Sequence, residues 1–273
     1  QGLFAVADGM GGQAQGAQAA QAALEALPPK KCWSPEAVLQ AYDAGNRAIC
    51  DQIGKIGKRS GATLTTLLLA DGEAYAANIG DSRCYLYRDG CLSRLSEDHT
   101  AVQRLIALGI IEPAEAKTHP ERHRLTQHLG SFPDELIIQP HTVQLPVRPG
   151  DRFLLCSDGL TDMLEEEDLC ALLRSQTAAP ACAAALYQLA MQRGGKDNIS
   201  VLLVGIARCS CPKRTERRAR PGAAFMRLYQ EKLQYQHDRA AADGDLKQIC
   251  AEPCGGDAQH QRGKARDGGA RGV

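Results

Sequence analysis

No apolar run in the 273-residue chain reaches the roughly 18 to 20 residues that would span a bilayer. A net charge is also lacking, because 32 Lys and Arg residues balance 32 Asp and Glu residues. The charges are unevenly placed: 14 basic and 8 acidic residues lie from Arg208 onward, which leaves 18 and 24 before it. The part of the chain before Arg208 is therefore acidic and lacks the positive surface that the phosphate backbone of a nucleic acid needs. We therefore expect a globular protein whose partners include neither a membrane nor nucleic acid.

The eleven cysteines lack the spacing of a disulfide framework. Three of them fall inside expected strands or helices, namely Cys84, Cys156 and Cys170. Small buried thiols of this kind are typical of a reducing cytosol, so we expect a cytoplasmic protein. The alternative is zinc bound by two close pairs, Cys209-x-Cys211 and Cys250-x3-Cys254, but the interval between them is long and irregular.

A recognisable signal peptide is absent as well, and the first residue is Gln1 instead of methionine. A strand-like apolar run over residues 3–7 follows almost at once. A start inside a strand predicts that the chain is a fragment without its true N-terminus.

Four carboxylates lie at the ends of short apolar runs: Asp8, Asp81, Asp158 and Asp197. Glycine follows the first and the third of them, as Gly9 and Gly159. Short apolar runs are typical of buried strands, so each carboxylate is expected at a strand end. A rim with several fixed carboxylates predicts a site for hard cations. The alternative for any one Asp-Gly pair is an ordinary turn.

Carboxylates that lie close together at neighbouring strand ends repel each other. The repulsion is roughly 4 kcal/mol for two unit charges about 4 Å apart at an effective dielectric near 20. Protonation or bound cations must relieve this repulsion. All-oxygen ligands favour Mg²⁺ or Mn²⁺ over zinc, and the two glycines leave room for backbone carbonyls or water. Two such ions could activate a water for attack on a phosphate ester, without a covalent enzyme intermediate.

Hydrophobic periodicity predicts helices and strands that come in groups. Helices are expected over residues 13–27, from Ser34-Pro35 to about residue 56, within 99–117, over 164–173 and over 180–191. Strands are expected over residues 62–70, 74–79, 83–88, 92–95, 136–145, 152–156 and 199–206, with a hairpin turn at Asp89-Gly90. Grouped strands with short links favour antiparallel sheets with helices packed outside.

The composition changes at residue 208, which predicts a folded domain over residues 1–207 and a basic tail over 208–273. Most of the tail is rich in Gly and Ala and poor in apolar residues, so we expect it to be largely disordered. One short helix is expected around residues 223–236.

Six motifs follow one another along the chain: VADGMGGQAQG, NIGDSRCYLYRDG, SEDHT, THPERHRLTQHLG, LLCSDGLTDML and GGKDNISVLLV. Together they resemble the metal-dependent protein phosphatases of type 2C, particularly their bacterial branch, from about residue 3 to residue 206. The resemblance implies an α+β fold, a four-layer α-β-β-α sandwich of two antiparallel sheets flanked by helices. It also implies a monomer that hydrolyses phosphoserine and phosphothreonine in proteins with a metal-activated water and counteracts a Ser/Thr kinase.

The resemblance assigns roles to individual residues. Asp8 would bridge two Mg²⁺ or Mn²⁺ ions, and the Gly9 carbonyl would bind the first of them. Asp158 and Asp197 would bind the second ion, so these two and Asp8 are the expected catalytic residues. Asp81 would help Asp158 to hold a third, weaker ion.

Further residues near this centre have less defined roles. Asp162 is expected near the third ion, and residues 61–63 match a small-residue strand motif with a structural role. Residues 102–130 cover the region that carries a mobile flap in bacterial members. His119 and His123 lie in this region, where we expect them to be solvated side chains instead of acids or ligands.

The chain departs from the family pattern in two ways. The family's phosphate-binding arginine and further acids belong to a strand that would precede Gln1, so no substrate-binding residue is assigned here. Met10 takes the place of the eukaryotic general-acid histidine, and methionine cannot donate a proton. These departures leave two alternatives open: an impaired or non-catalytic phosphoprotein-binding domain, and a basic tail that acts as an adaptor for acidic partners.

Overall fold

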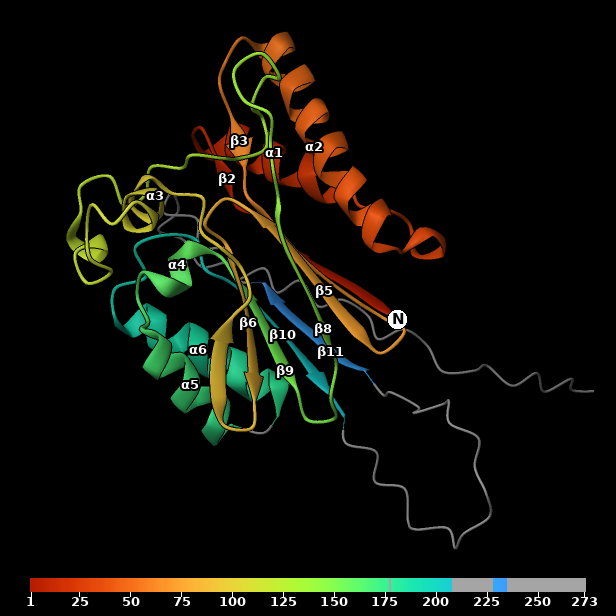
Figure 1. The fold of residues 1–273 in the computed structure, drawn as a ribbon, viewed down its shortest axis with the longest axis vertical. Coiled ribbons are helices and arrows are strands. Elements are labelled where there is room, and N and C mark those ends of the chain that lie inside the picture. Colours follow the sequence, from red (N-terminus) through yellow and green to blue (C-terminus); the bar gives the residue numbers. More distant parts are fainter. Residues whose placement is uncertain (177, 208–227, 235–273) are drawn as a thin grey trace, which may run out of the picture.

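Two antiparallel sheets pack face to face, and helices cover the outer side of each sheet (Figure 1). The structure is a computed structural model and describes residues 1–176, 178–207 and 228–234. The four-layer α-β-β-α arrangement confirms the predicted fold class.

The first sheet has the strand order β1-β4-β5-β8. Its strands are β1 (Gly2–Val6), β4 (Leu64–Ala70), β5 (Glu73–Ile79) and β8 (His141–Pro146). The second sheet has the order β11-β10-β9-β6-β7. Its strands are β6 (Arg83–Arg88), β7 (Cys91–Arg94), β9 (Arg152–Cys156), β10 (Ser200–Ile206) and β11 (Leu228–Gln234). The short strands β2 (Gly9–Met10) and β3 (Gly61–Ala62) form a separate pair.

Helices α1 (Gln13–Glu25) and α2 (Pro35–Ile56) pack on the first sheet, and α5 (Glu166–Ser175) and α6 (Ala179–Gln192) pack on the second. Two further helices are short: α3 (Ala101–Ala107), between β7 and β8 in sequence, and the one-turn α4 (Asp158–Thr161), after β9. The 3₁₀ turns are η1 (Lys30–Cys32) and η2 (Ala116–Thr118). Among the described residues, none of these helices has the length and apolar content needed to cross a bilayer.

Strand β4 shows why the sandwich forms. All seven of its residues are buried, because both faces of the first sheet are covered. Leu64 and Leu68 point to the helices, whereas Leu67 and Leu69 point to the second sheet. Successive side chains of a strand face opposite sides, so one apolar run supplies two hydrophobic layers. Each fully buried leucine contributes roughly 1.5–3 kcal/mol.

Local signals in the sequence set several element boundaries. The Ser34 Oγ accepts the Ala37 N–H at 3.1 Å and caps α2, which ends at Gly57 in the left-handed conformation. Asp89 and Gly90 both have positive φ, 52° and 87°, as the expected two-residue hairpin between β6 and β7 requires.

Two expected elements are shorter than predicted. The strand predicted over residues 136–145 begins only at His141, since the Leu136 N–H bonds to the Phe132 carbonyl in a turn and Pro140 has no N–H for a ladder. The helix predicted within 99–117 covers only Ala101–Ala107, because Gly109 adopts a φ of 66° just beyond it.

The helix predicted around residues 223–236 is wrong where the structure describes it, because residues 228–234 form strand β11. All seven of them pair with Ser200–Ile206 of β10. Without β11, strand β10 would be a sheet edge with unpaired backbone groups, and pairing satisfies these groups. The remaining tail residues, with their expected disorder and cysteine pairs, lie outside the described residues. The domain boundary at residue 207 stays a prediction.

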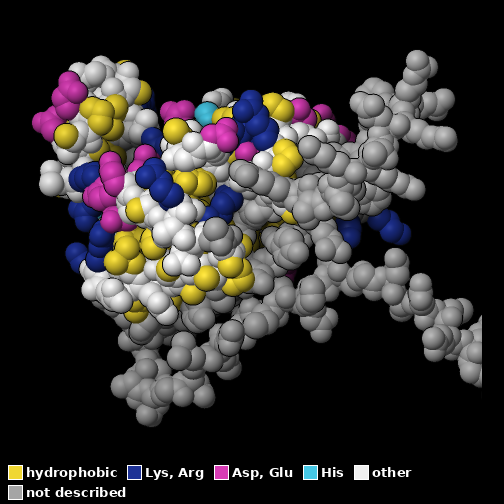
Figure 2. Space-filling view, turned by 90° about the horizontal axis from the view of Figure 1, so that it is seen from below, with side chains coloured by type: hydrophobic (Ala, Val, Ile, Leu, Met, Phe, Trp, Pro, Cys, Tyr) yellow, Lys and Arg dark blue, Asp and Glu magenta, His cyan; other side chains and the backbone are white. Residues whose placement is uncertain are grey.

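The face shown in Figure 2 carries acidic and basic side chains interspersed with small apolar areas. Among described residues, the large apolar side chains with the greatest exposure are Leu108 and Ile110, each 63% exposed, and Ile137, 75% exposed. The expected buried thiols Cys84 and Cys156 are buried, and Cys170 is partly buried.

Candidate metal centre

The four predicted carboxylates come from connections at the ends of strands of both sheets. Asp8 follows β1 of the first sheet, and Asp81 lies where the chain crosses from β5 to β6 of the second sheet. Asp158 begins α4 directly after β9, and Asp197 precedes β10. The negative charges of Asp158, Asp197 and Asp81 all raise the pKa of Asp8, so the four groups form one electrostatic cluster.

Asp8 is held in place through its backbone. The Asp8 N–H donates to Thr63 Oγ1 at 2.9 Å, and the Thr63 N–H donates to the Asp8 carbonyl at 2.8 Å. Thr63 Oγ1 also lies 2.8 Å from the Ser82 Oγ. One buried threonine therefore ties the end of β1 to the crossing that carries Asp81.

Asp158 and Asp197 approach each other because residue 159 has no side chain. A Cβ on Gly159 would lie 2.3 Å from the Asn198 carbonyl oxygen. Gly9 has a similar steric role, since its Cβ would lie 1.9 Å from the Gly16 carbonyl oxygen of α1. Both glycines are thus required for close backbone packing, whether or not a carbonyl binds an ion.

The carboxylates are costly to ionise together in the absence of cations. Burial, followed by repulsion from Asp158, raises the pKa of Asp8 to about 8. Burial and the Asp158 charge likewise raise the pKa of Asp81 to about 7. Burial and the nearby Asp162 raise the pKa of Asp158, while a hydrogen bond between the Asp8 and Asp158 carboxyl groups opposes this rise. A cluster in this state holds protons that a divalent ion would replace.

The donor atoms fit a hard divalent cation. The Oδ1 atom of Asp158 is buried and has no hydrogen-bond partner among the described residues, which is unusual for a buried carboxylate oxygen. Carboxylate oxygens are the ligands that Mg²⁺ and Mn²⁺ prefer. Asp197 is more exposed, and its Oδ1 accepts the Asn198 N–H at 2.7 Å.

His123, to which the sequence assigned no role in the site, lies close to the carboxylates. His123 Nε2 is 3.6 Å from Asp162 Oδ2, and the His123 side chain is 46% exposed. Ligand atoms of His123, Asp158 and Asp162 all lie within 4.8 Å of one another. His123 is exposed, as expected for a solvated side chain, and its neighbours Asp158 and Asp162 lie 35 and 39 positions further along the chain. His119 is not in this group, and its Nδ1 accepts the Glu121 N–H at 3.2 Å.

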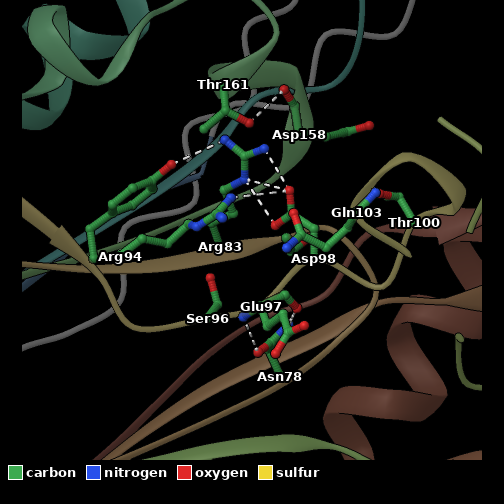
Figure 3. A network of polar contacts seen from close by, with 12 residues as sticks. Asn78, Arg83, Arg94, Ser96, Glu97, Asp98, Thr100, Gln103, Asp158 and Thr161 are labelled. Atoms are coloured by element: carbon green, nitrogen blue, oxygen red, sulfur yellow. Dashed lines mark hydrogen bonds and ion pairs between the residues drawn. The ribbon is translucent and has the colours of Figure 1, made fainter. Parts of the chain in front are cut away.

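A partly buried network of ion pairs next to the centre was not predicted (Figure 3). Arg83 Nε donates to both carboxylate oxygens of Asp98 at 3.0 Å, and Arg94 donates to the same carboxylate at 3.4 Å. Asp98 is only 8% exposed. The charge of Asp98 raises the pKa of Asp81, whereas that of Arg83 lowers it. Arg83 lies in the GDSR motif and Asp98 in the SEDHT motif, but only the fold shows that these two residues pair.

A cavity of about 630 Å³ opens beside the carboxylates. Asp81, Asp158 and Asp162 line this cavity together with residues of α3 and η2. This volume lies within the range of about 300–1,000 Å³ that is typical of ligand pockets. The cavity therefore gives a bound molecule access to the carboxylates.

The family model described as Protein phosphatase 2C matches residues 1–193. The chain belongs to the protein phosphatase 2C family. It is 37% identical over 211 residues to the serine/threonine protein phosphatase PstP of Mycobacterium tuberculosis, and the match covers 75% of this chain but only 40% of PstP. The serine/threonine phosphatase stp of Listeria monocytogenes is 32% identical, with 74% of this chain and 83% of stp covered.

Solved structures of this family share the fold. The crystal structure of M. tuberculosis PstP superposes with a TM-score of 0.68 and 36% identity, covering 74% of this chain and 86% of that one. The catalytic domain of PstP in complex with two manganese ions gives a TM-score of 0.64 and 35% identity, covering 74% and 85%. The predicted family, the bacterial type 2C phosphatases, is thereby confirmed.

Proposed function

We propose that the chain is a metal-dependent phosphatase that acts on phosphoserine and phosphothreonine in proteins. The observation that carries this proposal is that Asp8 and Asp158 lie in one cluster of carboxylates. The buried Oδ1 of Asp158 has no hydrogen-bond partner among the described residues. Membership in the type 2C family and the two manganese ions bound to a relative support it.

Five residues would hold the ions. Asp8 would bind two of them, the Gly9 carbonyl would bind the first, Asp158 and Asp197 would bind the second, and Asp81 with Asp158 would bind a third. Bound Mg²⁺ or Mn²⁺ supplies the charge that lowers the pKa of a water and stabilises the charge on a phosphoryl group. The protein contributes rigid placement of the ligands, through the Thr63 hydrogen bonds and the packing of α4.

The leaving group must obtain its proton from solvent. Met10 is 39% exposed beside Gly9 and has no proton to donate. An ordered water in the cavity would protonate the serine or threonine alkoxide. The proposal includes phosphorylated proteins, among them a Ser/Thr kinase, as partners of a cytoplasmic monomer.

Hydrolysis of a small aryl phosphate tests the proposal. With Mn²⁺, Asp158→Ala should lower kcat/KM by about 100-fold or more, because loss of a ligand costs at least as much as loss of a residue that orients one. Asp43→Ala removes an exposed acid of α2 as the matched control and should leave turnover unchanged. Turnover that persists in excess chelator would contradict the proposal and favour a non-catalytic binding domain.

A further inference from the structure

Two arginines that line the cavity share a single carboxylate. Arg83 of β6 and Arg94 of β7 both point toward Asp98 (Figure 3). All three side chains line the cavity, which also reaches Asp81 and Asp158. Two positive charges thus face one negative charge, so this network leaves an excess positive charge next to the candidate metal centre.

The carboxylate of Asp98 is bound mainly by Arg83. The Nε of Arg83 donates to both carboxylate oxygens at 3.0 Å, and its Nη2 donates to Oδ2 at 2.6 Å. The Nη1 of the same guanidinium donates to the Tyr85 hydroxyl at 3.2 Å. Multiple charge-assisted hydrogen bonds make a strong pair, so Asp98 neutralises Arg83 first.

Arg94 is held much less firmly. Within the described ranges, the only partner of its side chain is Asp98 Oδ2, which accepts from Nη1 at 3.4 Å. A guanidinium carries five N–H donors in a fixed fork, so most donors of Arg94 are unused. The side chain is 30% exposed, which leaves these donors accessible but partly shielded from bulk water.

Acidic side chains of α5 also line the cavity, but they do not neutralise Arg94. Glu165 forms an ion pair with Lys117. Glu166 and Glu167 lie in the first turn of α5 and are exposed, and solvent screens exposed charges. In the part of the chain that the structure describes, no residue of α5 forms an ion pair with Arg94.

Two other basic side chains line the cavity without an ion pair in the described ranges, Arg122 and Lys196. Both are exposed, whereas Arg94 is partly buried. Attraction between opposite charges grows as water is excluded, so Arg94 should attract an anion more strongly than the other two.

We propose that Arg94 forms a subsite for a second anionic group of the substrate, in addition to the phosphate that is hydrolysed. The preferred substrates then carry an acidic or a second phosphorylated residue close to the phosphoserine or phosphothreonine. Carboxylates and phosphates share the required chemistry, because both accept two parallel N–H bonds from a guanidinium. This inference rests on the proposed function and names a class of substrate for it.

Hydrolysis of four matched phosphothreonine peptides in the presence of Mn²⁺ tests the subsite. The residues next to the phosphothreonine are all alanine, or include two glutamates, two lysines, or one non-hydrolysable phosphonate. For the wild-type chain, kcat/KM of the glutamate peptide should exceed that of the alanine peptide by about tenfold, mainly through KM. The preference should weaken as ionic strength rises.

The phosphonate peptide distinguishes the two sources of the anion. A larger preference for phosphonate than for glutamate would identify a second phosphate as the group that Arg94 binds. An equal or smaller preference would identify an acidic side chain.

Substitutions assign the preference to one side chain. Arg94→Gln keeps polar donors but removes the charge, so the ratio of kcat/KM for the glutamate and alanine peptides should fall to about one. Arg94→Glu should reverse the preference in favour of the lysine peptide, which a general loss of structure could not produce. Arg47→Gln, at an exposed arginine of α2 outside the cavity, is the matched control and should keep the wild-type ratio.

The outcomes separate the two proposals. Equal kcat/KM for the glutamate and alanine peptides in wild type, or an unchanged preference in Arg94→Gln, would overturn this inference and leave the proposed function standing. Absence of Mn²⁺-dependent hydrolysis of all four peptides would overturn both.

Discussion

At the scale of single residues, the centre depends on carboxylates that are kept close at an energetic cost. Asp8 and Asp81 have pKa values raised to about 8 and about 7, first by burial and then by the charge of Asp158. Such a cost persists in a folded protein only when something offsets it, and bound cations are the simplest offset.

The raised pKa values predict how stability depends on pH in the absence of metal. Asp8 and Asp81 bind protons in the folded state that the unfolded chain releases above about pH 4, the ordinary pKa of aspartate. The unfolded state then binds fewer protons, so the free energy of unfolding should fall as pH rises from about 4 to about 8. Urea unfolding in chelator at several pH values measures this slope.

Two comparisons identify the groups responsible. Asp8→Asn should flatten much of the slope, because it removes a carboxyl group whose pKa burial raises to about 8. Saturating Mn²⁺ should do the same in wild type, since ions replace the protons. A slope of the same size in Asp8→Asn would show that other groups cause it.

The Thr63 hydroxyl offers a second prediction at this scale. Thr63→Val keeps the shape of the side chain but leaves the Asp8 N–H and the Ser82 hydroxyl without this partner. We expect a loss of about 1–3 kcal/mol of stability, because unsatisfied buried polar groups are costly. Thr63→Ser retains the hydroxyl and should lose clearly less in the same urea titration.

At the scale of elements, close backbone contacts place the carboxylates. Strand β9, the one-turn α4 and the residues before β10 meet where Gly159 touches Asn198. A side chain at residue 159 would push α4 away, and Asp158 would move with it.

A pair of glycine substitutions tests this contact. Gly159→Ala should lower both stability and Mn²⁺ affinity, since its Cβ would lie 2.3 Å from the Asn198 carbonyl oxygen. Gly54→Ala is the matched control in α2, where an added Cβ meets nothing within 4 Å. It should stabilise the protein by about 0.5–1 kcal/mol, because alanine is the better helix former. Equal behaviour of the two variants would contradict the role of Gly159.

At the scale of the whole molecule, the candidate centre joins the two sheets. Asp8 extends from the first sheet, Asp158 and Asp197 flank strands of the second, and Asp81 lies on the crossing between them. The hydrophobic layer between the sheets therefore supports the centre, and ion binding should in turn stabilise the sandwich.

A substitution inside this layer tests the coupling. Leu67→Ala should cost about 2–5 kcal/mol, because Leu67 is fully buried between the sheets. Leu39→Ala, at a side chain of α2 that is 39% exposed, should cost much less. Addition of Mn²⁺ should raise the Tm of both variants. Failure of Mn²⁺ to stabilise wild type would argue against a centre that spans the sheets.

The sequence by itself determined the order of most elements, from α1 to β10, because periodicity, the Ser34 cap and the Asp89-Gly90 turn act over a few residues. It also indicated the acids at strand ends, and its ordered motifs indicated the family. Only the tertiary structure decided that Arg83 pairs with Asp98, that His123 faces Asp162, and that residues 228–234 join β10 as a strand. These contacts link segments distant in sequence, and packing selects them after the local elements have formed. No local pattern therefore encodes them.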